Sequence, residues 1–318
     1  MEDSHSPRQS NVTSVSATTL AIITLETFPG MWINAFIVFV ISTAWVKRKT
    51  LNSNEKILLL LGCSRFCFLC SSWIFSFLSI LYPDYLYVHP IFQALIIITG
   101  FFNCSDLCVS TCLSVFYCIK IANFRNSCFI GLKVKIDKIV PWLLFGSQIF
   151  PMVIGILLYD ITDKAQCNNA TSLRNLGKLN MKMDEYFFPY YFITGLGFVT
   201  SLTAVISSAL LLLFSLWRHK RNMQTNSMNS PSMDAHIKAM KSILSFLVMY
   251  SMNFITMIVT MIYSTKERKR ETVLIFVFLY AFPGIHSLIL IFSNPKLVKT
   301  LFSILMCVKC RVCMKKEL

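Results

Sequence analysis

Three ionisable side chains stand inside long apolar runs of the sequence, at Glu26, Arg65 and Asp106. A charge in hydrocarbon is costly, so such residues usually pair with one another or face a water-filled cavity. Arg65 and Asp106 lie near the middles of two successive runs, and we predict an ion pair between them. The alternative is an Arg65 that binds backbone carbonyls and an Asp106 that is protonated or lies in a wet cavity.

Cysteine is the other residue type that could do chemistry here. Cys104, Cys108 and Cys112 are spaced by four and share one helix face. We interpret them as small apolar packing residues rather than metal ligands. Three more cysteines in residues 307–313 stand beside basic residues and favour reversible palmitoylation over zinc, for which a fourth ligand is missing. Motifs of soluble catalysis are absent from the sequence, so we expect no enzyme, cofactor or metal.

Composition indicates a membrane protein. The 318 residues are 55% apolar and 14% charged, whereas soluble domains have about 25% charged residues. A helix crosses the ~30 Å hydrocarbon layer with about 20 residues. The fold class we predict is an all-α membrane protein, a bundle of seven transmembrane helices. The predicted spans are 18–45, 56–82, 90–118, 139–160, 186–216, 239–263 and 272–293.

Charge placement predicts the orientation. The net charge is +15, and twenty Lys and Arg against four Asp and Glu follow spans one, three, five and seven. The positive-inside rule then puts the N-terminus, residues 1–17, outside the cell and the tail, residues 294–318, in the cytoplasm of a plasma-membrane protein. We expect a lipid bilayer around residues 18–293 and no nucleic acid. Asn-x-Ser/Thr triplets at Asn11 and Asn169 fall on the outer side and are candidate glycosylation sites, although chance also produces such triplets.

Five motifs in the expected order carry a family resemblance. They are LLLLGCSR at 58–65, CLSVFYCIKIANF at 112–124, LFSLWRHKRNMQ at 213–224, AHIKAMK at 235–241 and HSLILIFSNPKL at 286–297. Over nearly its whole length the chain resembles the bitter taste receptors, the type 2 taste receptors. The resemblance implies a seven-helix G-protein-coupled receptor that binds small bitter compounds and activates a heterotrimeric G protein of the gustducin kind.

The matches cluster at the predicted cytoplasmic ends of the helices, where a shared signalling partner would dock. The resemblance implies that the G-protein-facing residues include Tyr117, Lys120, His219, His236, Lys238 and Lys241. The alternative for each base is plain membrane topology and attraction to anionic lipid.

The family's ligand pocket lies among the outer halves of helices three, five, six and seven. Asn103 takes the family's third-helix Asn position and is our first candidate for a ligand hydrogen bond. The weaker wall candidates are Phe102, Thr99, Tyr190, Asn253, Phe276 and Tyr280. Thr99 replaces the family's usual Trp, and Asp106 replaces a Ser, which indicates a divergent member. Asp106 would also let a basic compound be sensed at the pocket floor, unless Arg65 neutralises it.

Signalling would follow a population shift, in which agonist favours the active arrangement. His286 and Ser287, with Pro283 just before them, are our candidates for a hinge in the seventh helix. The nearest rival is another chemosensory receptor, such as the vomeronasal type 1 group. A small transporter or channel is a rival from another class, and an integral membrane enzyme comes third.

Overall fold

The computed structural model describes residues 7–86, 90–122, 124, 126–171, 183–223 and 269–314, and residues 244–259 except 246, 249, 253 and 257. These residues are almost entirely helical. The elements are α1 (Pro7–Arg48), α2 (Ser53–Leu81), α3 (Pro83–Leu86), α4 (Ile91–Ile121), α5 (Ser127–Ser147), α6 (Ile149–Thr171), α7 (Met183–Met223), α9 (Lys269–Ser293) and α10 (Pro295–Met314).

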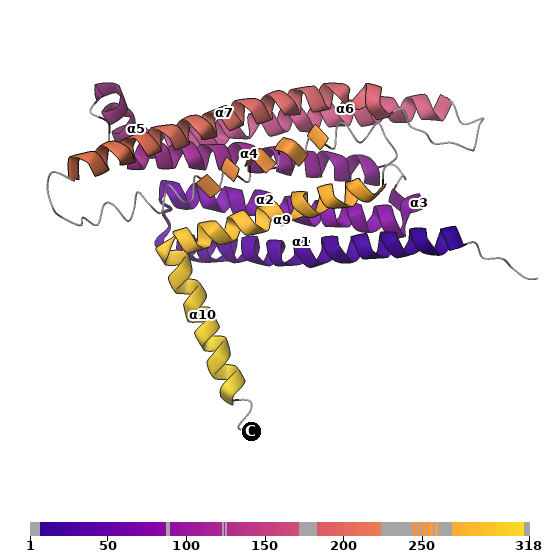
Figure 1. The fold of residues 1–318 in the computed structure, drawn as a ribbon, viewed down its shortest axis with the longest axis horizontal. Helices are drawn as coiled ribbons and strands as arrows, with labels where there is room; N and C mark the ends of the chain where they lie inside the picture. Colours follow the sequence, from indigo (N-terminus) through magenta and orange to yellow (C-terminus); the bar gives the residue numbers. More distant parts are fainter. Residues whose placement is uncertain are drawn as a thin grey trace, which may run out of the picture.

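The long helices run side by side as a bundle (Figure 1). Helix α4 lies at its centre, since it contacts α2, α5, α6 and α7, while α1 packs against α2 and α9. Helix α1 ends, α2 begins, α4 ends and α10 begins at one end of the bundle, which carries Arg48, Lys120 and Lys296. We call this end the basic end.

Five of the predicted spans correspond to helices long and apolar enough to cross a membrane, among the residues that the structure describes. They are Ala17–Arg48, Ser53–Leu81, Ile91–Ile121, Ser127–Lys164 and Phe192–Ser215. Leu279–Ser293 and Pro295–Cys307, taken together as one bent helix pair, are also long and apolar enough. Helix α9 alone has 25 residues, about 38 Å at 1.5 Å each. The predicted sixth span, 239–263, is helical wherever residues 244–259 are described.

The fourth span is made of two helices that meet at Gln148. Proline has no backbone N–H, so Pro151 leaves the carbonyl of Ser147 without its helical donor. The chain instead tightens, and the Gln148 N–H bonds to the Phe145 carbonyl at 3.1 Å. Pro151 stands in the first turn of α6, where the missing N–H is tolerated.

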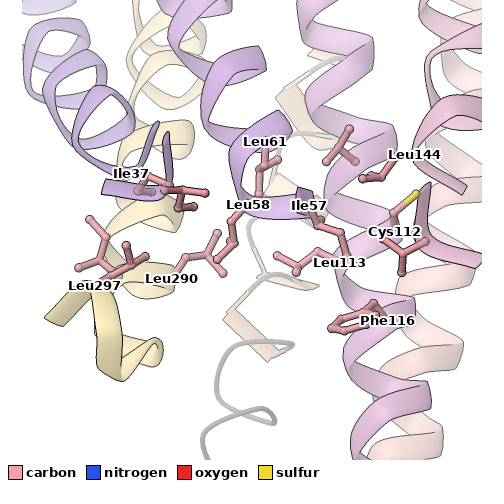
Figure 2. Close-up of a cluster of buried hydrophobic side chains, with 14 of the residues drawn as sticks. Ile37, Ile57, Leu58, Leu61, Cys112, Leu113, Phe116, Leu144, Leu290 and Leu297 are labelled. Atoms are coloured by element: carbon pink, nitrogen blue, oxygen red, sulfur yellow. The ribbon is translucent and has the colours of Figure 1, made fainter. Parts of the chain in front are cut away.

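A buried apolar cluster ties the helices together toward the basic end (Figure 2). It joins Ile37 of α1, Leu61 of α2, Leu113 of α4, Leu290 of α9 and Leu297 of α10, all nearly inaccessible to solvent. Since Leu297 stands in the first turn of α10, that turn is anchored to the bundle core.

Helix α10 leaves the bundle at a bend of 99° from α9 (Figure 1). Pro295 begins α10, and the Asn294 side chain accepts a hydrogen bond from the Lys296 N–H at 3.1 Å. Proline at the first helical position and an Asn cap before it are a helix-start signal. The predicted tail, 294–318, therefore starts as a helix that turns away from the membrane-spanning direction.

Candidate functional site

The two charged residues predicted to pair do so in the structure. Arg65 Nε on α2 donates to Asp106 Oδ1 on α4 across 2.7 Å, and the side chains are 3% and 17% exposed. The predicted ion pair between neighbouring helices is confirmed. Arg65 stands twelve residues into α2, about 18 Å along the helix axis, so the pair lies deep within the bundle.

Arg65 also donates hydrogen bonds to α9 and to a second residue of α4. Its Nη1 donates to Ser287 Oγ at 2.9 Å, and its Nη2 donates to Ser110 Oγ at 3.1 Å and to His286 Nδ1 at 2.6 Å. A guanidinium has no acceptor, so Nδ1 of His286 must accept. The imidazole is therefore neutral, with its proton on Nε2.

The network continues into α1 through Ser287. Ser287 Oγ donates to Asn34 Oδ1 at 2.7 Å, and the Asn34 amide donates to the Gly30 carbonyl at 2.8 Å. The two backbones approach closely here, because a Cβ added to Gly284 would lie 3.2 Å from the Gly30 Cα. Arg65, Asp106, Ser110, His286, Ser287 and Asn34 form what we call the Arg65 cluster, which joins α1, α2, α4 and α9.

A cavity of about 40 Å³ opens above the Arg65 cluster. Its floor contains Arg65, Asp106, Ser110 and His286, and its described walls are Phe68, Asn103, Leu107, Tyr250, Leu279, Phe282 and Pro283. Helix α4 runs toward the basic end, so Asn103 lies one turn farther from that end than Asp106. Helix α2 begins at the basic end and α9 ends there, so Phe68 and Leu279 also lie on the far side.

The predicted ligand residues fall into separate groups. Asn103 and Asp106 line the cavity. Phe102 and Tyr280 belong to another cluster, with Ile23 and Leu69, and Tyr280 hydrogen-bonds Ser76 of α2 at 3.2 Å. Thr99, one turn before Asn103, has a buried hydroxyl with no hydrogen-bond partner among the described residues. The backbones of Tyr190 in α7 and Phe276 in α9 are described but their side chains are not, and Asn253 lies outside the described residues.

The predicted G-protein-facing residues are only partly described. Tyr117 and Lys120 line an open pocket of about 600 Å³ at the basic end, and Lys120 pairs with Asp137 at 2.6 Å. His219 lies in α7 with its side chain undescribed, and His236, Lys238 and Lys241 lie outside the described residues. The candidate glycosylation residues Asn11 and Asn169 lie in α1 and α6, and their side chains are undescribed.

Two of the three cysteines on the predicted face of α4, Cys104 and Cys112, pack as expected. Cys104 lies in an apolar cluster with Ile154 and Leu158 of α6, and Cys112 lies in the cluster at the basic end. Gly100 extends this close packing, since a Cβ there would clash with the Leu158 side chain.

Sequence reasoning missed three polar residues of the site, Asn34, Ser110 and Tyr250. Asn34 and Ser110 complete the Arg65 cluster, and the Tyr250 hydroxyl bonds the Leu107 carbonyl at 3.2 Å and Thr111 at 3.1 Å. An Asn in the middle of an apolar run was a usable signal. Ser110 stands one helical turn after Asp106, a spacing that places both on one face.

Long apolar helices side by side, joined by a buried charged cluster beneath a cavity, define a multi-pass helical membrane protein. Comparison with known proteins identifies which family of membrane proteins this is. Residues 12–309 match the family model described as Taste receptor protein (TAS2R), and the chain belongs to this family of seven-helix G-protein-coupled chemosensory receptors for bitter taste.

Individual relatives agree over most of the chain. It is 30% identical to Taste receptor type 2 member 2 of Homo sapiens over 302 residues, which cover 94% of this chain and 97% of the relative. It is 32% identical to Taste receptor type 2 member 40 of Gallus gallus over 293 residues, covering 90% and 93%. It is 33% identical to Taste receptor type 2 member 103 of Mus musculus over 296 residues, covering 91% and 92%.

Proposed function

We propose that this receptor binds small bitter compounds on the side of the bundle away from the basic end, in the cavity above the Arg65 cluster. The observation that carries the proposal is the position of Asn103. Its side chain lines a cavity whose floor is made of Arg65 and His286. A ligand that contacts Asn103 therefore lies directly above the groups that join α1, α2, α4 and α9.

The size of the cavity suggests how binding becomes a signal. About 40 Å³ is room for a few waters at most, since a buried water needs roughly 10–15 Å³ of such space. Ligand pockets are usually ≈ 300–1,000 Å³. A bitter compound therefore enters only if the walls separate, and the ligand stabilises whichever arrangement has the wider cavity.

The Arg65 cluster couples that widening to the basic end. Separating the wall residues Asn103 of α4 and Phe282 of α9 moves two helices that both bond Arg65. The cluster then has to exchange partners, which makes His286 and Ser287, just after Pro283, the proposed switch. Asp106 is already neutralised by Arg65, so we expect the floor to favour neutral polar ligands over cations.

We further propose that the basic end faces the cytoplasm and contacts a heterotrimeric G protein of the gustducin kind. The excess of Lys and Arg at this end supports the orientation. Tyr117 and Lys120 line the open pocket there, beside the predicted contributions of His219, His236, Lys238 and Lys241. A plasma-membrane location with Asn11 and Asn169 outside follows from the same orientation.

The test is a calcium assay in cells that express the receptor with a gustducin-like chimeric G protein, challenged with a panel of bitter compounds. We expect dose-dependent responses that vanish without the G protein. Asn103→Ala should shift the response to higher agonist concentrations by about tenfold, as expected for a lost hydrogen bond to a ligand. Ile98→Ala, an exposed position on the same helix, is the matched control.

Two outcomes would contradict the proposal. Equal responses from Asn103→Ala and Ile98→Ala receptors, at equal surface expression, would remove Asn103 from the ligand site. A ligand-evoked current that persists without any G protein would favour the transporter or channel alternative.

A further inference from the structure

A groove of about 470 Å³ lies between α1 and the start of α10. It is lined by Phe39, Val40, Thr43, Ala44, Lys47, Arg48, Lys296 and Thr300. Its wall on α1 is mostly apolar, and its rim is basic. Nothing in the bitter-ligand proposal uses this groove, which is separate from the cavity above the Arg65 cluster.

The groove exists because of the bend between α9 and α10. The Asn294 cap and Pro295 start α10 at 99° to α9, and the buried Leu297 fixes its first turn to the core (Figure 2). Helix α10 then extends away from the bundle beside the end of α1 (Figure 1). Phe302 and Met306 are exposed along it. Helix α10 thus runs across the direction of the membrane-spanning helices and exposes apolar residues. Both features suit a helix that lies at a membrane interface.

The rim of the groove is positively charged, with Lys47, Arg48 and Lys296 in its lining. Arg48 and Lys296 both pair with one carboxylate oxygen, Glu55 Oε1, each at 2.7 Å. Lys47 is exposed. Two of the three cations on the rim therefore share a single buried carboxylate. The Arg48 and Lys296 side chains are still 45% and 43% exposed, so both have donors available to a further anion.

The apolar wall of the groove indicates which class of anion would bind at the rim. Phe39 and Ala44 lie within the predicted span 18–45, so the wall faces hydrocarbon while the rim lies at its edge. A phospholipid has this division of chemistry, with a phosphate at the interface and acyl chains below it. Lys and Arg at this depth attract anionic lipids. A soluble acidic partner would bring no group for the apolar wall.

We propose that this groove binds one anionic glycerophospholipid. Its phosphate lies against Lys47, Arg48 and Lys296, and an acyl chain lies along Phe39 and Ala44. The bound lipid fills the angle between α1 and α10 and so fixes the direction of α10.

The experiment uses the full-length receptor, purified in detergent and incubated with equimolar phosphatidylserine and phosphatidylcholine. Native mass spectrometry then counts the lipids that remain bound. Wild-type receptor should retain one phosphatidylserine in clear preference to phosphatidylcholine. The double variant Lys47→Gln/Lys296→Gln should lower phosphatidylserine binding by about tenfold, because it removes two of the three cations.

A matched variant separates the groove from general charge. Lys135→Gln/Lys299→Gln removes the same charge from exposed positions on α5 and α10 outside the groove lining, and it should bind lipid as the wild type does. Ala44→Leu fills the apolar wall without changing charge and should also weaken binding. Thermal stability of each purified variant verifies folding.

Three results would overturn the proposal. The wild-type receptor could retain phosphatidylserine and phosphatidylcholine equally, a result that does not depend on whether any variant folds. The two double variants could lose phosphatidylserine to the same extent. A soluble polyglutamate peptide could displace the lipid at concentrations where phosphatidylserine itself does, which would assign the rim to an acidic protein partner.

Discussion

Arg65 donates a hydrogen bond to Ser287 Oγ across 2.9 Å, joining two helices whose residues are 222 positions apart in the chain. The same hydroxyl donates a hydrogen bond to Asn34 Oδ1 at 2.7 Å. One serine therefore connects α2, α9 and α1. Because all three side chains are buried, water is poorly placed to substitute for any of them.

Ser287→Ala should destabilise the receptor. The change leaves an N–H of Arg65 and the Asn34 carbonyl oxygen without a partner, and a buried unsatisfied group costs ≈ 1–3 kcal/mol. We expect a lower midpoint of thermal inactivation for the purified receptor. The control is Ser293→Ala on the same helix, whose hydroxyl bonds the Ile289 carbonyl one turn back within α9. Equal midpoints for the two variants would deny Ser287 its interhelical role.

The receptor should tolerate replacement of Asp106 better than replacement of Arg65. Asp106→Asn keeps an oxygen for Arg65 Nε, and Arg65 retains three further acceptors. Arg65→Ala leaves the partly buried Asp106 charge without its cation, and it removes the donor to Ser287, Ser110 and His286. Breaking a buried pair by removing one partner costs about 3–5 kcal/mol, an upper bound for a carboxylate that is 17% exposed. Surface expression, measured by antibody binding to intact cells, should fall far more for Arg65→Ala.

A charge swap sharpens this prediction. Asp106→Arg with Arg65→Asp should recover only part of the lost expression, since an Asp at 65 cannot donate to Ser287 or His286. Normal surface expression of both single variants, Asp106→Arg and Arg65→Asp, would show that the ion pair does not stabilise the receptor.

His286 is the position where signalling and folding should separate. Its neutral imidazole accepts from Arg65 at 2.6 Å directly beneath the cavity. His286→Asn keeps a hydrogen-bond acceptor at this position but places it at a different distance from Arg65. We expect agonist-evoked calcium signals to fall severalfold more than surface expression. Equal losses in both measurements would indicate only a folding role.

Much of this architecture could be predicted from the sequence because hydrocarbon imposes strong rules. Span positions follow from the length of apolar runs, and the Arg65–Asp106 pair follows from the cost of lone charges there. The rest depends on contacts that no local pattern encodes. Ser287 is one of many serines, and only the packing of α9 against α1 and α2 sets it beside Arg65. The packing of Tyr280 with Ile23 of α1 and Leu69 of α2 was likewise not visible in any local pattern, and its predicted contact with a ligand stays a prediction.

Lys120 allows a test of the proposed G-protein surface without loss of stability. Its ion pair with Asp137 is about half exposed on both sides, 47% and 52%, and such surface pairs contribute ≈ 0–1 kcal/mol. Lys120→Ala should leave thermal stability nearly unchanged but reduce agonist-dependent G-protein activation. Asp137→Asn removes the same pair and leaves the Lys120 cation free. If both variants reduced activation equally, the pair itself rather than the lysine would be responsible.

The approach of α1 to α9 should be sensitive to a single methyl group. A Cβ at Gly284 would lie 3.2 Å from the Gly30 Cα, so a backbone has to move. Gly284→Ala should therefore separate the two helices, stretch the Ser287–Asn34 hydrogen bond three residues on, and lower the midpoint of thermal inactivation. Gly146→Ala is the control, because a Cβ there meets no atom of the described residues within 4 Å. In that open position Ala should stabilise its helix by up to about 1 kcal/mol, so the two substitutions should move the midpoint in opposite directions. A Gly284→Ala receptor as stable as the wild type would show that α1 and α9 do not depend on this contact.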